Sequence, residues 1–160
     1  MILIGLGSSL ALCGRLPQDV IRLAAGALDA HFGVAAASGL YASPAWPDPK
    51  DPPFVNAALA LAAAPDPEVL LARLHVIEAA FGRRRSRKNA PRTLDLDLLA
   101  YGDVTMEGPV SLPHPGLFSR DFVLAPLAEI APEFRPPRSD RTIRDLLVDL
   151  GAISAVPVSG

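Results

Sequence analysis

The sequence predicts an α+β sandwich in which helices pack against a mostly antiparallel sheet. Stretches with the two-residue period of strands are interspersed with stretches of helical period, without the strict strand–helix–strand alternation of a parallel sheet. The chain has 160 residues, of which half are hydrophobic and a fifth are charged. This length and composition suffice for one domain with its own core and exclude a wholly disordered chain.

The first half of the chain predicts three strands and one helix. Residues 2–4 form a short buried strand that enters a glycine-punctuated turn at residues 5–9. Residues 17–32 follow helical spacing, with Pro17 suited to the first turn. Strands are expected over 34–42 and 54–63, and the five prolines between Pro44 and Pro53 predict a loop. The apolar stripe of the helix is expected to comprise Val20, Leu23, Ala24, Ala27, Leu28, His31 and Phe32.

The second half predicts three helices and one long strand. A helix begins after Asp66, with Leu70, Leu74 and Ile77 on its apolar stripe, and ends at Gly82. Residues 83–92 form a loop, 93–101 a strand and 104–110 a short hairpin, and residues 116–130 form a turn and a helix. A last amphipathic helix spans 142–150. We expect one domain over residues 1–151 and a frayed tail over 152–160.

Composition excludes several classes of protein. A single cysteine excludes an intramolecular disulfide framework, and three separated histidines argue against a structural metal cage. The apolar runs are too short or too interrupted to span a bilayer. No Lys or Arg precedes the first apolar run, and Leu12 stands where a lipid-anchor signal has a small residue before Cys13. We therefore expect a cytoplasmic protein with no membrane partner.

The net charge of −2 conceals a local concentration of positive charge. Residues 83–92 hold six of the 15 basic residues and no acidic residue, which leaves nine basic residues against 17 acidic ones elsewhere. This distribution indicates an anion-binding segment rather than a nucleic-acid-binding protein as a whole.

The sharpest local feature is the pair of aspartates in the strand over 93–101. Since alternate side chains share a face, Leu94, Leu96 and Leu98 point into the core, while Asp95 and Asp97 project together on the other face, about 6.6 Å apart. Two carboxylates at this separation repel by roughly 3 kcal/mol at an effective dielectric constant of 20, so they call for a cation. Their oxygen ligands suit Mg²⁺ with substrate phosphates. The alternative is the solvent-facing half of an amphipathic edge strand.

The basic loop leads directly into this strand and favours the first interpretation. Magnesium together with converging guanidinium groups is the usual equipment for phosphoryl transfer, because that reaction depends on charge neutralisation and alignment. A solvated basic run would ordinarily contain interspersed acidic residues, and residues 83–92 contain none.

In order, these pieces resemble the 6-hydroxymethyl-7,8-dihydropterin pyrophosphokinase family, also called 2-amino-4-hydroxy-6-hydroxymethyldihydropteridine diphosphokinase. The similar stretches run from Leu6 to about Pro132. They are LGSSL (6–10), LYASPAW (40–46), FVNAALAL (54–61), E-x3-GRRR (78–85), APRTLDLDLLAYG (90–102) and LPHPGLFSRDFVLAPLAEIAP (112–132). The resemblance implies a ferredoxin-like α/β sandwich and an ATP-dependent diphosphotransferase of folate biosynthesis.

The resemblance also implies roles for the residues on the nucleotide side. Asp95 and Asp97 match the ligands of two Mg²⁺ ions, and Arg83 and Arg92 match the catalytic-loop arginines. The matches to ATP-binding positions are Glu78, Arg85, His114 and Arg120.

On the pterin side, the resemblance implies Ser43, Pro44, Phe54, Asn56 and Phe122. Two aromatic faces hold a flat heterocycle well, and an amide offers donors and an acceptor to its edge. Without the resemblance, each phenylalanine would be interpreted as a core residue.

The implied reaction is an in-line attack by the pterin hydroxymethyl oxygen on the β-phosphorus of Mg-ATP, which releases AMP. We expect a monomer whose partners are ATP and a dihydropterin, with no nucleic acid.

Two alternatives are a nucleic-acid-binding module, which would use the basic loop and sheet aromatics, and a relative that binds nucleotide without catalysis. The family pattern has Trp-Gly where this chain has Asn89-Ala90. Because no predicted metal ligand or phosphate-facing arginine is replaced, we expect activity to be retained.

Overall fold

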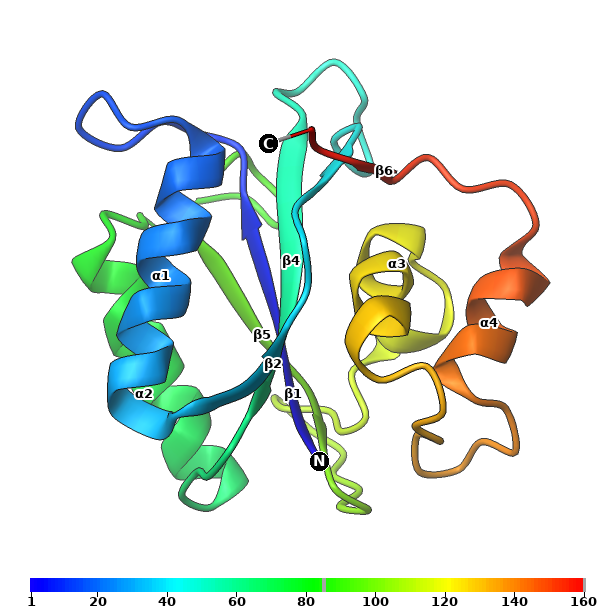
Figure 1. Ribbon diagram of the computed structural model, residues 1–160. Helices are drawn as coiled ribbons and strands as arrows, with labels where there is room; N and C mark the ends of the chain where they lie inside the picture. The colour runs from blue at the N-terminus through cyan, green and yellow to red at the C-terminus, as the bar shows by residue number, and fades with distance from the viewer. Residues whose placement is uncertain (85, 160) are drawn as a thin grey trace.

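The computed structural model, which describes residues 1–84 and 86–159, is a three-layer sandwich. An antiparallel sheet with the strand order β5-β1-β4-β3-β6 forms the middle layer, and β2 also pairs with β4. Helices α1 and α2 cover one face, whereas α3 and α4 lie on the other (Figure 1). The predicted α+β class, with helices on a mostly antiparallel sheet, is confirmed.

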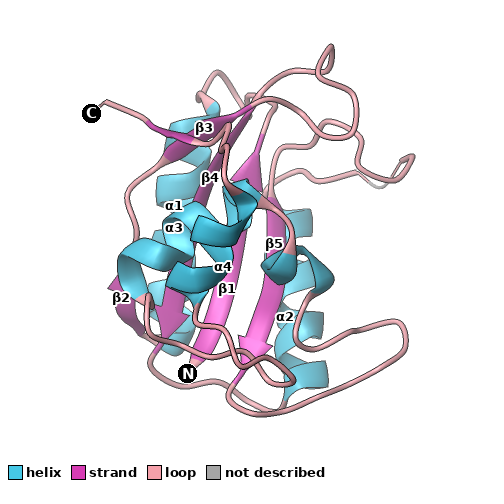
Figure 2. Cartoon of the chain, turned by 90° about the vertical axis from the view of Figure 1, so that its right-hand side faces the viewer, coloured by secondary structure: helices cyan, strands magenta, loops and turns pink. Residues whose placement is uncertain are grey.

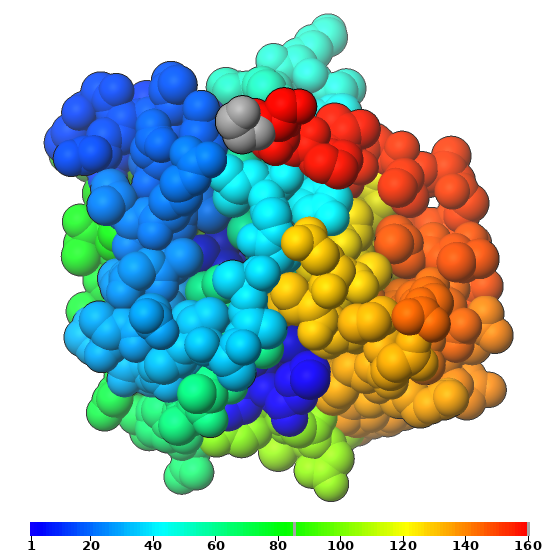
Figure 3. Space-filling view, in the orientation of Figure 1, coloured from blue at the N-terminus to red at the C-terminus, as the bar shows by residue number. Residues whose placement is uncertain are grey.

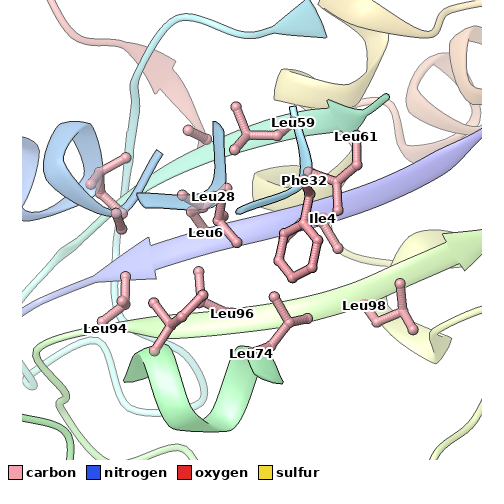
Figure 4. Close-up of a cluster of buried hydrophobic side chains, with 14 of the residues drawn as sticks. Ile4, Leu6, Leu28, Phe32, Leu59, Leu61, Leu74, Leu94, Leu96 and Leu98 are labelled. Carbon is pink, nitrogen blue, oxygen red and sulfur yellow. The ribbon is translucent and has the colours of Figure 1, made fainter. Parts of the chain in front are cut away.

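The three long central strands are β1 (Ile2–Ser8), β4 (Phe54–Leu61) and β5 (Asp95–Tyr101). On the α1/α2 face, their alternate residues form the larger core cluster, which α1 (Pro17–Phe32) and α2 (Pro67–Ala80) complete. Figure 4 shows this cluster, including Ile4, Leu6, Leu59, Leu94, Leu96 and Leu98. Burial of these aliphatic side chains, at roughly 1.5–3 kcal/mol each, fixes which residues of each strand face the other layer.

The opposite face carries a smaller core under α3 (Asp121–Ile130) and α4 (Ile143–Leu150). Figure 2 views the sheet through these two helices. A 3₁₀ turn, η1 (Pro115–Phe118), leads into α3, and Thr142 caps α4 in a reciprocal capping box with Asp145. The small side chains of Ala58 and Ala60 let α3 approach β4 closely. Helix α3 covers only one half of this sheet face, so the other half remains open for a site.

Three segments differ from the sequence-based expectations. The glycines at 5 and 7 lie inside β1 rather than in a turn. The predicted strand over 34–42 divides into β2 (Val34–Ala37) and β3 (Tyr41–Ser43). Between them Ser38 remains hydrogen-bonded to Ala58 through its N–H and its hydroxyl, whereas the Gly39 N–H donates to the Glu129 carboxylate. The predicted hairpin over 104–110 is reduced to an isolated bridge between Met106 and Leu112.

The predicted fraying of the C-terminal tail is wrong. Val156–Pro157 forms a short strand, β6, at the edge of the sheet beside β3, and Ala155 is 2% exposed. The chain therefore crosses from α4 back to the sheet (Figure 1). Local composition could not reveal this pairing, because the partner strand lies more than a hundred residues earlier in the chain.

The helices follow their predicted spans, with one shift of face. In α1 the buried side chains include Ile21, whereas Leu23 and His31, which we expected on the stripe, are exposed, Leu23 by 46%. Asp66 occupies the N-cap position of α2, but its side chain makes no capping hydrogen bond. Within the described residues, no helix is both long and apolar enough to cross a membrane.

Candidate active site

A cavity of about 370 Å³ lies on the open half of the sheet face, where β1 ends and β4 and β5 begin. Antiparallel pairing brings these ends together, although they are far apart in sequence. Ten of the predicted site residues line the cavity: Ser43, Pro44, Phe54, Asn56, Arg92, Asp95, Asp97, His114, Arg120 and Phe122.

The floor of the cavity is backbone, because β1 carries glycine at both cavity-facing positions. Gly5 lies between Asp97 of β5 and Ala58 of β4, and Gly7 lies between Asp95 and Asn56. A Cβ atom at Gly7 would lie 3.5 Å from the Asn56 amide oxygen. Any larger side chain there would occupy the space between the carboxylates and the amide. The two glycines therefore create the room in which a ligand can lie across the sheet.

Asp95 is neutralised by two arginines from the basic loop. Its carboxylate lies 2.7 Å from the Arg83 guanidinium and 3.1 Å from that of Arg92. Because charge-assisted contacts of this kind are strong and directional, they hold the two ends of the basic loop, at Arg83 and Arg92, against the start of β5. Lys88 and Asn89 of the same loop line the cavity.

Asp97 is in a different electrostatic environment. Within the described part of the chain, no cation lies within ion-pair distance of its carboxylate. Burial, and next the neighbouring charge of Asp95, raise the pKa of Asp97 from its ordinary value of 3.8 to about 7, although Arg92 and Arg120 act in the opposite direction. Such a carboxylate gains most from an added cation.

Glu78 lies beneath the cavity rather than in its wall. Its side chain is buried; one oxygen accepts the Leu96 N–H at 2.8 Å and lies 2.6 Å from the Arg83 guanidinium. Burial raises the pKa of Glu78 despite these two contacts. This geometry supports a positioning role for Glu78, which ties α2, β5 and Arg83 together. Arg83 itself lies along the basic loop outside the main cavity, and Arg85 lies outside the described residues.

His114 presents a defined edge of its ring. Its Nδ1 accepts the Gly116 N–H at 3.0 Å, and its own backbone N–H donates to the Leu99 carbonyl at 2.8 Å. Burial and the charge of Arg120 lower the pKa of His114, so the ring is neutral near pH 7. A neutral imidazole whose Nδ1 accepts a hydrogen bond carries its proton on Nε2. His114 can therefore donate that proton to an anionic ligand.

Aromatic side chains also line the cavity. Phe54, Phe122 and Trp46 are among the lining residues, and the Asn56 amide donates to the Ser43 hydroxyl at 2.8 Å. The Arg120 guanidinium carbon lies 4.7 Å from the centroid of the Trp46 ring and 5.9 Å from that of Phe122. A cation at these distances is attracted by the ring faces. The part of the cavity that these rings bound is called its aromatic end below. It adjoins the charged groups, because the Arg92 guanidinium carbon lies 5.7 Å from the centroid of the Phe54 ring.

The sequence reasoning missed several residues that shape the cavity. The glycines at 5 and 7 were attributed to a turn, although their two-residue spacing after an apolar strand is the signal of a strand face without side chains. Lys88 and Asn89 were included in the basic loop without individual roles. Gly116 lies beneath His114 and Arg120, and no local motif indicates its importance.

Comparison with known proteins identifies relatives along most of the chain. The family model of 7,8-dihydro-6-hydroxymethylpterin-pyrophosphokinase matches residues 3–132. A 2-amino-4-hydroxy-6-hydroxymethyldihydropteridine pyrophosphokinase of Synechocystis is 39% identical over 98% of this chain and 79% of the relative. The protein with the same description from Pseudomonas aeruginosa is 37% identical over 85% and 83% of the two chains.

Solved structures show the same fold. The Plasmodium falciparum HPPK-DHPS structure with pteroate has a TM-score of 0.71 and 15% identity, and the match covers 92% of this chain. This chain spans 42% of that longer protein, so the likeness concerns one part of it.

Proposed function

Since the chain belongs to the 7,8-dihydro-6-hydroxymethylpterin-pyrophosphokinase family, we propose that it transfers diphosphate from ATP to 6-hydroxymethyl-7,8-dihydropterin in folate synthesis, with release of AMP, at the cavity between Asp95 and Phe54. The observation that carries the proposal is the combination of groups that line this cavity. Two carboxylates, Arg92 and Arg120 line it together with two phenylalanines and a buried amide. The charged groups suit a triphosphate, and the flat rings suit a heterocycle.

The carboxylate pair fits magnesium. Mg²⁺ is commonly held by one or two carboxylates together with substrate phosphates, and Asp97 is a desolvated acid without a cation in ion-pair contact in the described part of the chain. We propose that Asp95 and Asp97 hold two such ions, which supply charge neutralisation for the triphosphate.

In this proposal, Arg83 and Arg92 exchange the Asp95 carboxylate for phosphate oxygens of the substrate. In the ligand-free chain, Arg83 and Arg92 are held by Asp95. Ions held by Asp95 and Asp97 would supply positive charge there, and Arg83 and Arg92 would then contact phosphate oxygens, where guanidinium groups stabilise the transferring group. Glu78 retains its contact with Arg83 and limits how far that side chain can move. His114 donates its Nε2 proton to the nucleotide, and Arg120 contributes a second positive charge.

At the aromatic end, the pterin ring lies between Phe54 and Phe122, and Asn56 contacts its edge. This pose points the hydroxymethyl group toward the carboxylates, since Asn56 and Asp95 flank Gly7 on either side. The reacting oxygen and the β-phosphorus are then brought into line by binding alone, which is the main contribution that a loose phosphoryl-transfer transition state requires.

The test is AMP release measured with ATP, magnesium and the dihydropterin, each omitted in turn. We expect turnover only with all three. Asp97→Asn should lower kcat by at least about a hundredfold, whereas Phe122→Ala should mainly raise the KM for the pterin. Val148→Thr, on the exposed side of α4, is the matched control and should leave both parameters unchanged. Turnover of Asp97→Asn within about tenfold of the parent would contradict the metal site.

We further propose that the chain acts as a monomer in the cytoplasm. The reaction needs only small substrates, and all the residues assigned to it come from one chain. Size-exclusion chromatography with light scattering tests the first statement, and fractionation of cells tests the second.

A further inference from the structure

The aromatic end of the cavity has two walls that come from different layers of the fold. One wall is the end of β3 and the segment after it, with Ser43, Pro44 and Trp46, and the other is the N-cap and first turn of α3, with Arg120 and Phe122. Across the gap, the Arg120 guanidinium lies over the Trp46 ring. The distance between these two walls determines how much room a flat ring has. A segment that holds the two walls together therefore determines that distance.

Asp121 is the first residue of α3 and lies between Arg120 and Phe122 in the sequence. Its side chain points away from the cavity toward the C-terminal segment. One carboxylate oxygen accepts hydrogen bonds from the Ser154 N–H, from the Ser154 hydroxyl at 2.8 Å and from the Ala155 N–H at 3.0 Å. The other oxygen accepts the Phe122 N–H at 2.8 Å. Partial burial alone would raise the pKa of Asp121, but these hydrogen bonds outweigh it and hold the pKa below its usual range.

The segment that Asp121 holds continues into the other wall. Val156 and Pro157 pair with Ala42 and Tyr41 of β3, and the Val158 N–H donates to the Leu40 carbonyl at 2.8 Å. The space-filling view shows these last residues, in red, lying against the cyan part of the chain that contains β3 (Figure 3). Residues 152–158 therefore connect the start of α3 to β3, which leads directly into Ser43 and Trp46.

A second connection joins the same two elements at the far end of α3. The Glu129 carboxylate accepts the Tyr41 hydroxyl at 2.9 Å and the Gly39 N–H at 3.0 Å. Because this contact already keeps α3 on the sheet, loss of the Asp121 contacts would free only the end of the helix that borders the cavity.

We propose that residues 152–158 form a strap that sets the width of the aromatic end of the cavity, and that Asp121 is the positioning residue through which the strap acts. The strap touches no substrate. It fixes the start of α3 relative to β3, and so determines where Phe122 and Arg120 stand opposite Trp46. The ligand assigned to this space, the pterin, rests on the function proposed above, whereas the mechanical role of the strap does not.

The first experiment needs no substrate, because Trp46 is the single tryptophan of the chain. Acrylamide quenching of its fluorescence reports how closely Arg120 covers the ring. Asp121→Asn removes the charge that holds the strap and replaces no side chain that lines the cavity. We expect the quenching constant to rise by about twofold, with a cooperative thermal transition that shows the variant is folded.

The second experiment measures steady-state kinetics of the same variant. We expect the KM for the dihydropterin to rise about fivefold, while kcat at saturation of both substrates stays within about twofold of the parent. A generally destabilised enzyme would lose active protein and hence kcat, so the split between the two parameters identifies a positioning role. Val156→Thr, which alters an exposed side chain of the strap but keeps its backbone pairing, is the control and should match the parent.

Ser154→Ala removes one of the three strap donors to Asp121 and decides the outcome if Asp121→Asn does not fold. It should change quenching and the pterin KM in the same direction by a smaller factor. Unchanged quenching and unchanged pterin KM in a folded variant would overturn the inference. A parent chain that releases no AMP would instead overturn the proposed function, and the quenching comparison would still test the strap.

Discussion

Replacement of Asp97 by asparagine should stabilise the ligand-free protein while it removes activity. The carboxylate lies beside Asp95 in a desolvated site, and its pKa is raised from 3.8 to about 7. Because a tenfold change in an equilibrium constant corresponds to about 1.4 kcal/mol, ionised Asp97 costs about 4 kcal/mol of unfolding free energy. The amide carries no charge and avoids this cost, so about 4 kcal/mol is the upper bound of the gain.

The gain should depend on pH with a defined sign. Folding raises the pKa of the Asp97 carboxyl group, so its contribution to the free energy of unfolding is fully present only below the pKa of the unfolded chain, near pH 4. That contribution is lost as the pH rises toward the folded-state pKa of about 7. The parent should therefore lose stability relative to Asp97→Asn between about pH 4 and pH 8. For a chain of this length, a gain of about 4 kcal/mol corresponds to roughly 8–16 °C in Tm at pH 8.

The assay is thermal unfolding followed by circular dichroism in excess EDTA, at pH 5 and at pH 8. Asp95→Asn is the matched comparison two residues away on the same face of β5. It breaks the contacts with Arg83 and Arg92, so it should lower Tm at both pH values. The reasoning is refuted if Asp97→Asn is less stable than the parent at pH 8, or if its gain is equal at both pH values.

Three further substitutions test how the site is supported. Gly116→Ala would place a Cβ 2.9 Å from the Arg120 Cδ, so we expect kcat/KM to fall about tenfold in a protein that still unfolds cooperatively. Gly7→Val would fill the floor of the cavity, and we expect the pterin KM to rise at least about tenfold in steady-state assays. Glu78→Ala leaves the Leu96 N–H without its acceptor and should lower the unfolding free energy by about 2–3 kcal/mol in urea titrations, whereas Glu78→Gln should lower it less.

The strand over 93–101 shows why much of the fold could be predicted. Its leucines and aspartates alternate with a period of two, and burial of Leu94, Leu96 and Leu98 against α2 forces both carboxylates onto the opposite face. The local period, the proline-rich loop and the helix boundaries are all expressed within windows of about ten residues, which is the range over which backbone preferences act. The ten predicted residues that line the cavity follow from this local alternation together with the family resemblance.

What escaped prediction depends on contacts between distant segments. The packing of α2 on β5 determines whether Glu78 faces a ligand or lies beneath Arg83. In the folded sheet the Leu96 N–H donates to the Glu78 carboxylate, and this contact holds the side chain beside Arg83. The C-terminal segment is mostly small and apolar and too short to show a period, and it is ordered by the unpaired edge of β3 together with the carboxylate of Asp121. Neither partner is visible from the sequence around residue 155.

The position of the site follows from where α3 begins. Along the α3 face of the sheet, three neighbouring strands change from apolar residues under the helix to polar residues or glycine beyond it. Strands β1 and β5 change one row earlier than β4, where Ala58 still belongs to the core. From the covered end to the open end, these residues are Leu3, Gly5 and Gly7 on β1, Leu99, Asp97 and Asp95 on β5, and Ala60, Ala58 and Asn56 on β4. One more turn at the start of α3, about 5.4 Å of helix, would cover the row of Gly5 and leave the carboxylates without a ligand. The first residues of α3 thus mark the edge of the core and supply a wall of the cavity, and the Asp121 carboxylate among them accepts hydrogen bonds from Ser154 and Ala155 near the end of the chain.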